Sequence, residues 1–178
     1  NYLKKNIKLE NKKILHIGIG NSFFAQLLLN KNIIFGISVS SKEIVKAKNL
    51  NLVNYKVYLC DKFSTDFSEL FINNKFDIIV DNNIKSYSCC KLSYNYFLDN
   101  LFKILNNKGI LITSRKGMNW HKNIVPKLSF SFKKLFHYKL KEINGNSENI
   151  MSLDEAKILS DKYSLNLNFD EKICFFEK

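Results

Sequence analysis

The chain has 178 residues, of which 46% are hydrophobic and 25% charged, a composition typical of one globular domain rather than a disordered chain. No apolar run reaches the roughly 18–20 residues that cross a bilayer, so we expect no membrane partner. The formal net charge of +12 allows a nucleic-acid partner, although AT-rich codons, which favour lysine, explain it better. Arg115 is the only arginine, and lysine makes poorer bidentate contacts to phosphate or guanine.

Short apolar segments alternate with helical patterns through most of the chain. This alternation predicts an α/β domain with a parallel sheet between two layers of helices, because strands buried on both faces are apolar nearly throughout. The expected parallel strands are residues 13–17, 33–39, 55–59, 76–80 and 110–113. The expected helices are residues 21–29, 41–49 with Ser40 or Ser41 as N-cap, and 88–105 with a left-handed Asn or Gly C-cap among residues 106–109.

The end of the chain follows a different pattern. Residues 152–163 form an expected helix that begins with a capping box of Ser152 and Glu155. Strands at 165–169 and 173–176 follow, and so short a connection between them allows only antiparallel pairing. The sequence therefore predicts a three-layer sandwich, with a mostly parallel seven-stranded sheet and a C-terminal antiparallel hairpin, as one domain over residues 1–178.

Residues 115–149 interrupt the alternation. This segment holds the single proline, and between Arg115 and Lys141 it carries eight basic residues and no acidic one. A connection this long in a compact domain is often a lid or a binding loop. An insertion that packs on the body of the domain is the other interpretation, and residues 115–141 are the place where a nucleic acid would bind.

Cysteine usage indicates a reducing compartment, so we expect a cytoplasmic protein. Cys89 and Cys90 are neighbours, which rarely pair with each other, while Cys60 and Cys174 lie in apolar runs where a thiol behaves as a small hydrophobe. The three histidines have no metal-ligand spacing with the cysteines, and we expect no metal site.

The strongest functional signal is the run from His16 to Ser22, in which Gly18 and Gly20 follow the first strand directly. Glycine is required where a side chain would collide with a ligand lying across a strand end, and the next helix offers unpaired backbone N–H groups. A dinucleotide site would need a third glycine at Phe23 and an acidic residue ending the second strand, and both are missing.

The chain resembles the class I S-adenosylmethionine-dependent methyltransferase family over nearly its whole length. The family's first loop reads acidic-x-Gly-x-Gly, its third strand ends in an acidic residue and its sheet closes with an antiparallel hairpin. The matching segments are Gly18 and Gly20, Gly36-Ile37-Ser38-Val39-Ser40 (like the Gly-x-Thr-x-Ser of the cyclopropane-synthase-like branch), Asp61, Phe76–Asn83 and Leu105–Leu111.

The resemblance implies a Rossmann-like fold, S-adenosylmethionine as cofactor and methyl transfer as activity. The residues that it places at the cofactor are His16, Gly18, Gly20, Asn21, Ser38, Asp61, Lys62 and Asp81. Two of them depart from the family: His16 replaces an acidic residue near the methionine ammonium, and Ser38 replaces the carboxylate that holds the ribose hydroxyls. A hydroxyl makes weaker bonds than a carboxylate, so we expect modest cofactor affinity.

Asp81 is the candidate catalytic residue, because it ends the fourth strand where it could contact the acceptor or the amino group of the cofactor. A helix-capping or loop carboxylate is the alternative. Tyr87, Arg115, Trp120 and His121 could line the acceptor pocket, or could pack in the core or the lid. Residues 81–84 lack the Asp/Asn-Pro-Pro-Tyr pattern of many methyltransferases that act on amino groups of nucleic acids and proteins.

Two functional hypotheses follow. The first is a methyltransferase that acts on a small-molecule acceptor. The second is a catalytically silent Rossmann-like protein that serves as a binding or RNA-associated subunit, which the residues at His16 and Ser38 and the basic segment favour.

Overall fold

The computed structural model describes residues 9–85, 88, 90–114, 151–170 and 172–178. Within these residues, strands and helices alternate from the first strand to the fifth, as the sequence pattern predicts. The elements are β1 (Lys13–Ile17), α2 (Phe23–Leu28), the 3-10 turn η1 (Leu29–Lys31), β2 (Ile33–Ser38), α3 (Ser41–Asn49), β3 (Tyr55–Leu59), α4 (Thr65–Phe71), β4 (Phe76–Asp81), α5 (Lys91–Ile104), β5 (Leu105–Ser114), α7 (Leu153–Tyr163), β6 (Asn166–Phe169) and β7 (Ile173–Glu177).

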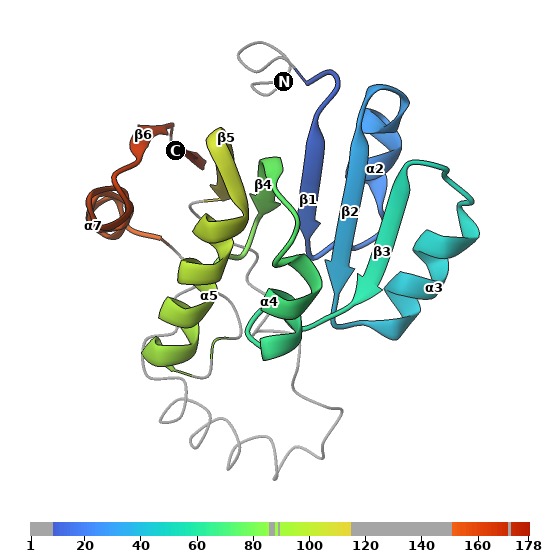
Figure 1. Ribbon diagram of the computed structural model, residues 1–178, viewed down its shortest axis with the longest axis horizontal. Helices are drawn as coiled ribbons and strands as arrows, with labels where there is room; N and C mark the ends of the chain where they lie inside the picture. The colour runs from blue at the N-terminus through green and yellow to red at the C-terminus, as the bar shows by residue number, and fades with distance from the viewer. Residues whose placement is uncertain (1–8, 86–87, 89, 115–150, 171) are drawn as a thin grey trace, which may run out of the picture.

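One sheet of seven strands forms the centre of the described structure, in the order β3-β2-β1-β4-β5-β7-β6 (Figure 1). The five strands from β3 to β5 are parallel, whereas β7 is antiparallel to both β5 and β6. The predicted mostly parallel sheet with a C-terminal hairpin is confirmed. The chain reverses its direction of travel across the sheet between β1 and β4, which is the point where open α/β sheets bind ligands.

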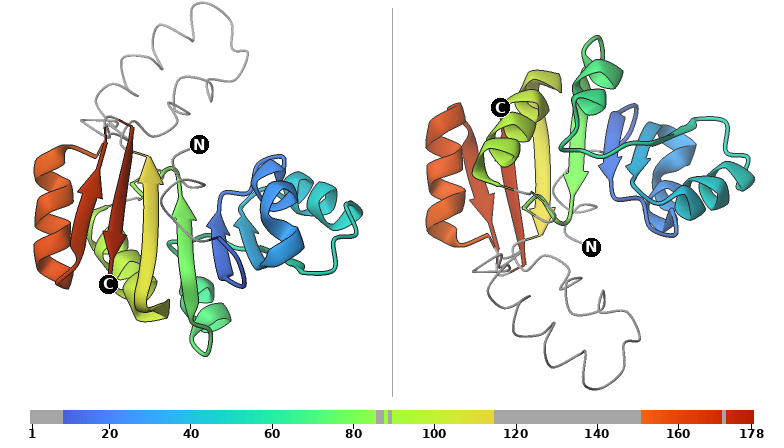
Figure 2. Two further views of the ribbon diagram at one scale, coloured as in Figure 1. Left: turned by 90° about the horizontal axis from the view of Figure 1, so that it is seen from above. Right: turned by 90° about the horizontal axis from the view of Figure 1, so that it is seen from below.

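Helices cover both faces of the sheet, so the domain has the predicted three layers (Figure 2). Ala25 of α2 and Ile44 of α3 join the apolar cluster on one face. Phe67 of α4, Phe97 of α5 and Ala156 of α7 join the cluster on the other face. On this second face α7 lies beside the β6 edge of the sheet.

Aromatic rings fill the core beneath α4 and α5. Phe35, Phe71 and Phe76 meet edge to face, with ring centroids 5.3–6.4 Å apart. Phe97 packs against Phe67 at 5.4 Å and against Phe63 at 5.3 Å. Such pairs stabilise beyond their buried area, and here they tie α4 and α5 to the sheet.

Two helix predictions need correction. Residues 65–71 form α4, which the sequence analysis did not predict, because the segment has only seven residues and so carries little helical periodicity. The predicted left-handed C-cap of α5 is wrong: α5 ends at Ile104, and Leu105 is already extended, so the helix runs directly into β5. The left-handed residue nearby is Lys108, with φ +64°.

Both serine N-cap predictions are confirmed. Ser40 accepts a hydrogen bond from the backbone of Glu43 at the start of α3. Ser152 and Glu155 form a complete capping box at the start of α7.

We expect Gly36→Ala to lower the free energy of unfolding by about 1–3 kcal/mol, because overpacking in a close-packed core costs that much. A Cβ at Gly36 would lie 2.6 Å from Cγ2 of Ile19 and 3.0 Å from the hydroxyl oxygen of Tyr55. Urea unfolding measures the loss. Adding Ile19→Ala removes the closest atom, so the double variant should lose less than the sum of the single variants. Strict additivity would contradict this packing.

Candidate functional site

The carboxyl ends of β1, β2, β3 and β4 lie side by side and bring the predicted site residues to one edge of the sheet. Ile17 at the end of β1 pairs with Ile37 of β2 and with Asp81 of β4. Ser38 at the end of β2 pairs with Leu59 at the end of β3. His16, Ser38, Asp61 and Asp81 therefore come from four neighbouring strand ends, as parallel pairing requires.

The loop after β1 has the backbone that its glycines predict. Gly18 and Gly20 have φ values of +76° and +54°, which L side chains rarely adopt. A Cβ at either position would meet no described atom within 4 Å, so the glycines border open space. The loop is held to β2 by the backbone N–H of Gly18, which donates to the carbonyl of Ile37 at 2.9 Å.

The side chains of Asn21 and Ser22, the two residues after Gly20, form hydrogen bonds with nearby parts of the protein. The Asn21 side-chain oxygen accepts from the backbone N–H of Phe23 at 3.1 Å. Ser22 is buried and left-handed at φ +61°, and its hydroxyl bonds to that of Tyr55 at 3.0 Å. The tight turn therefore continues through a small residue that is locked to β3.

His16 lies on the face of the sheet that α2 covers and is only 5% exposed. Its ring packs against Phe24 of α2, with centroids 4.8 Å apart. Nδ1 has no hydrogen-bond partner among the described residues. Burial lowers the pKa of His16 from 6.5 to about 4, against a smaller opposite effect of Asp81, so the imidazole is neutral near pH 7. The ring is therefore a neutral group enclosed between β1 and α2, and its Nδ1 is unpaired among the described residues.

Ser38 is buried at the end of β2 and is paired with a carboxylate that sequence reasoning missed. Its hydroxyl donates to Oε2 of Glu43 at 2.6 Å and accepts from the backbone N–H of Ser40 at 3.0 Å. Glu43 lies in the first turn of α3 and is partly buried. The following helix thus brings a carboxylate to the end of β2.

The spacing between Ser40 and Glu43 was visible in the sequence, where it indicates a capping box. Ser40 and Glu43 form the same Ser-x-x-Glu spacing as Ser152 and Glu155, which is a capping box in α7. In α3 only one half of the box forms, because the backbone N–H of Ser40 bonds to Ser38 while Glu43 also turns to Ser38.

Asp61 follows β3 and is exposed. Its side chain accepts from the backbone N–H of Phe63 at 2.9 Å, and its carbonyl accepts from Ser64. These bonds fix the loop and leave the carboxyl group accessible at the edge of the crevice. Beside it, Val39 and Leu59 are 72% and 60% exposed, so apolar side chains flank this end of the site.

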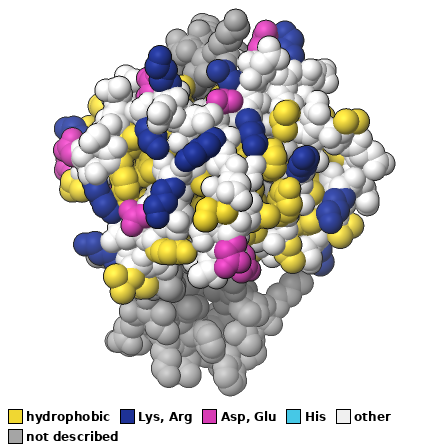
Figure 3. All heavy atoms as spheres, in the orientation of Figure 1, with side chains coloured by type: hydrophobic (Ala, Val, Ile, Leu, Met, Phe, Trp, Pro, Cys, Tyr) yellow, Lys and Arg dark blue, Asp and Glu magenta, His cyan; other side chains and the backbone are white. Residues whose placement is uncertain are grey.

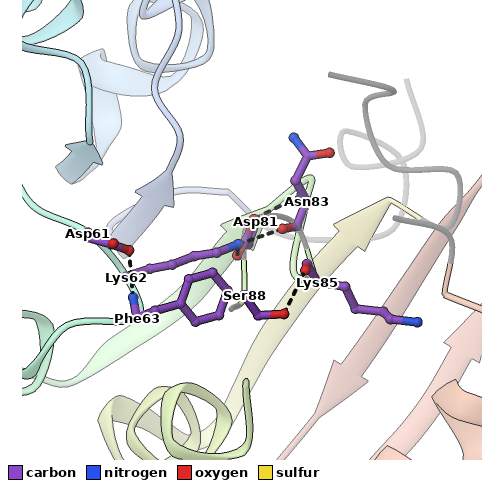
Figure 4. A network of polar contacts seen from close by, with 7 residues as sticks. All are labelled: Asp61, Lys62, Phe63, Asp81, Asn83, Lys85 and Ser88. Carbon is purple, nitrogen blue, oxygen red and sulfur yellow. Dashed lines mark hydrogen bonds and ion pairs between the residues drawn. The ribbon is translucent and has the colours of Figure 1, made fainter. Parts of the chain in front are cut away.

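Lys62 and Asp81 form an ion pair at the end of β4 (Figure 4). Nζ of Lys62 lies 2.8 Å from Oδ2 of Asp81 and donates to the carbonyl of Asn83 at 2.5 Å. Oδ1 of Asp81 accepts from the backbone N–H of Asn83 at 2.9 Å. Both oxygens of the predicted catalytic carboxylate are therefore engaged by the protein.

Tyr87, Arg115, Trp120 and His121, together with the predicted lid at 115–149, lie outside the described residues. In the part of the chain that is described, no cluster of three His, Cys, Asp or Glu side chains could hold a metal ion. None of the helices in that part is long and apolar enough to cross a membrane.

Residues 8–169 match a family model described as a methyltransferase domain. The fold is shared with N-methyltransferase NodS from Bradyrhizobium japonicum WM9, at TM-score 0.61 and 16% identity over 95% of this chain and 87% of that one. A TehB-like SAM-dependent methyltransferase from Corynebacterium glutamicum gives TM-score 0.65 and 14% identity over 99% and 85% of the two chains. A SAM-dependent methyltransferase from Methanosarcina mazei gives 0.62 and 15% over 99% and 95%. A search of curated proteins gave no match.

The depressed pKa of His16 predicts an acid-sensitive fold. A neutral buried histidine stabilises fully above its unfolded-state pKa of 6.5, and that stability is lost as the pH falls toward its folded-state pKa of about 4. We expect a loss of about 3 kcal/mol between pH 7 and pH 4 from this residue. Urea unfolding of the wild type and His16→Leu at several pH values measures it. Parallel pH profiles for the two proteins would contradict the assignment.

Proposed function

Since this chain belongs to the methyltransferase-domain family, we propose that it transfers the methyl group of S-adenosylmethionine to a small-molecule acceptor, in the crevice at the carboxyl ends of β1 to β4. S-adenosylmethionine is the cofactor of the family. The observation that carries the proposal is the open space beside Gly18 and Gly20. Both have a left-handed backbone, which would be strained with any larger residue at either position.

The residues around this space fit the parts of the cofactor. The glycine loop would lie under the sulfur and the methionine chain, and His16 at the end of β1 is the residue predicted to lie near the methionine ammonium. Glu43, positioned by Ser38, would bind the ribose hydroxyls. Asp61 would accept from the adenine amino group. Asn21, Lys62 and Asp81 complete the predicted set.

The cofactor supplies a methyl group on a positively charged sulfur, which is already activated for displacement. The protein then has to align the acceptor with the methyl group and exclude water. Asp81 would fix the turn at the end of β4 rather than take a proton from the acceptor, because it is buried and Lys62 and Asn83 occupy both of its carboxylate oxygens.

A small-molecule acceptor is favoured over a nucleic acid by the arrangement of charge. Figure 3 shows lysines spread over the face viewed there, among acidic side chains and apolar patches, rather than gathered into one basic stripe. For an RNA-associated subunit, the basic segment at residues 115–141 is the predicted contact. We place the protein in the cytoplasm, which the buried Cys60 thiol supports.

Calorimetric titration with S-adenosylhomocysteine tests cofactor binding. We expect micromolar binding to the wild type, and binding about tenfold weaker for Asp61→Ala, because a hydrogen bond to a charged group is lost. Gly20→Val should abolish binding, since its side chain fills the open space. Glu69→Ala, which removes an exposed carboxylate of α4, is the matched control. A folded wild type that gives no heat would favour the silent subunit.

Glu43→Gln should weaken S-adenosylhomocysteine binding by about tenfold, because a carboxylate accepts from hydroxyls more strongly than an amide does. Adding Ser38→Asp should restore the affinity, since this change returns a carboxylate to the end of β2. Glu155→Gln changes the glutamate of the other Ser-x-x-Glu motif, so it should lower the melting temperature and leave the affinity unchanged. If Glu43→Gln binds S-adenosylhomocysteine as tightly as the wild type does, the role of Glu43 is only structural, at the start of α3.

A further inference from the structure

The Asp81 carboxylate is buried at the end of β4, where its charge needs a compensating partner. The side chain is only 2% exposed. A carboxylate removed from water loses its hydration, and without a partner it takes up a proton instead of remaining charged. The charge that Asp81 carries therefore depends on the groups packed around it.

Lys62 is the cation that faces this carboxylate, and it is itself almost enclosed. Its side chain is 10% exposed, and its Nζ lies over the rings of Phe63 and Phe97 at 5.1 and 5.2 Å from their centroids. Figure 4 shows the ammonium between the carboxylate and the carbonyl of Asn83. These two groups and the two aromatic faces all favour a positive charge.

Two other titratable side chains interact with Asp81, and neither supplies a compensating charge near pH 7. His16 of β1 is neutral, because burial lowers its pKa to about 4. Tyr94 of α5 is also neutral, because burial raises the pKa of its hydroxyl. The described elements around Asp81 therefore leave the compensation of its charge to Lys62.

We infer that Lys62 is a positioning residue, which compensates the charge of the buried Asp81 and holds the turn at Asn83 in one arrangement at the end of β4. The inference rests on the proposed function, since it concerns the charge that the cofactor's sulfonium meets. Lys62 is bound to both the strand-end carboxylate and the turn carbonyl, so it clips the β3–α4 loop to the end of β4. The sulfonium then meets a neutral ion pair instead of an isolated acid.

Comparison of S-adenosylmethionine with S-adenosylhomocysteine tests the inference, because the sulfonium charge of the first ligand is missing from the second. The readout is the ratio of their dissociation constants, measured by calorimetry between pH 5.5 and 8.5. In the wild type we expect the ratio of the two dissociation constants to stay the same over this pH range. In Lys62→Met the unpaired Asp81 ionises only as the pH rises, so S-adenosylmethionine should gain about tenfold over S-adenosylhomocysteine toward high pH.

Three variants make the result specific. Lys62→Arg keeps the positive charge and should restore the flat ratio. Lys62→Met with Asp81→Asn removes the titrating group, should also be flat, and avoids the buried unpaired charge that could prevent Lys62→Met from folding. Lys31→Met breaks the exposed pair with Glu10, makes the same change in charge, and should leave the ratio unaltered.

A pH-independent ratio in Lys62→Met would overturn the inference while leaving the proposed function intact, and so would a pH dependence that persists in the double variant. Should Lys62→Met not fold, recovery of folding on adding Asp81→Asn supports the inference, and a double variant that also fails to fold overturns it. Failure of the wild type to bind either ligand would overturn the proposed function and the inference together.

Discussion

The pairing of β1 with both β2 and β4 is the constraint on which the rest of the structure depends. It is formed by apolar residues that are almost completely buried, including Leu15, Ile34 and Ile79. From β1 the chain builds the sheet in one direction through β2 and β3, and from β4 it builds the sheet in the other direction. The helices α2 and α4 therefore lie on opposite faces, and no crossover covers the strand ends between them. The crevice follows from this arrangement before any polar residue is considered.

The strands could be predicted because parallel strands buried on both faces are apolar along nearly their whole length. The observed bounds of β1 (Lys13–Ile17) and β3 (Tyr55–Leu59) agree with those predicted from the sequence. The start of β5 could not be predicted in this way. Its pairing with β4 shifts register between Phe76 and Ile78, and Asn106 donates to Asp77, a contact between residues far apart in the sequence.

The candidate site shows the same limit of sequence reasoning. Positions such as Gly18 and Gly20 could be predicted because a backbone requirement restricts them to one residue type. The partners of Ser38 and Asp81 could not, since Glu43 and Lys62 belong to residue types that usually lie in solvent. Their roles depend on which of several hydrogen bonds a side chain makes in the folded protein. A complete capping box in α7 and an incomplete one in α3, from the same spacing, illustrate the point.

The ring of Phe97 belongs at once to the apolar core and to the surroundings of the Lys62 ammonium. A rotation of α5 would therefore alter the electrostatic field at the strand ends as well as the packing beneath them.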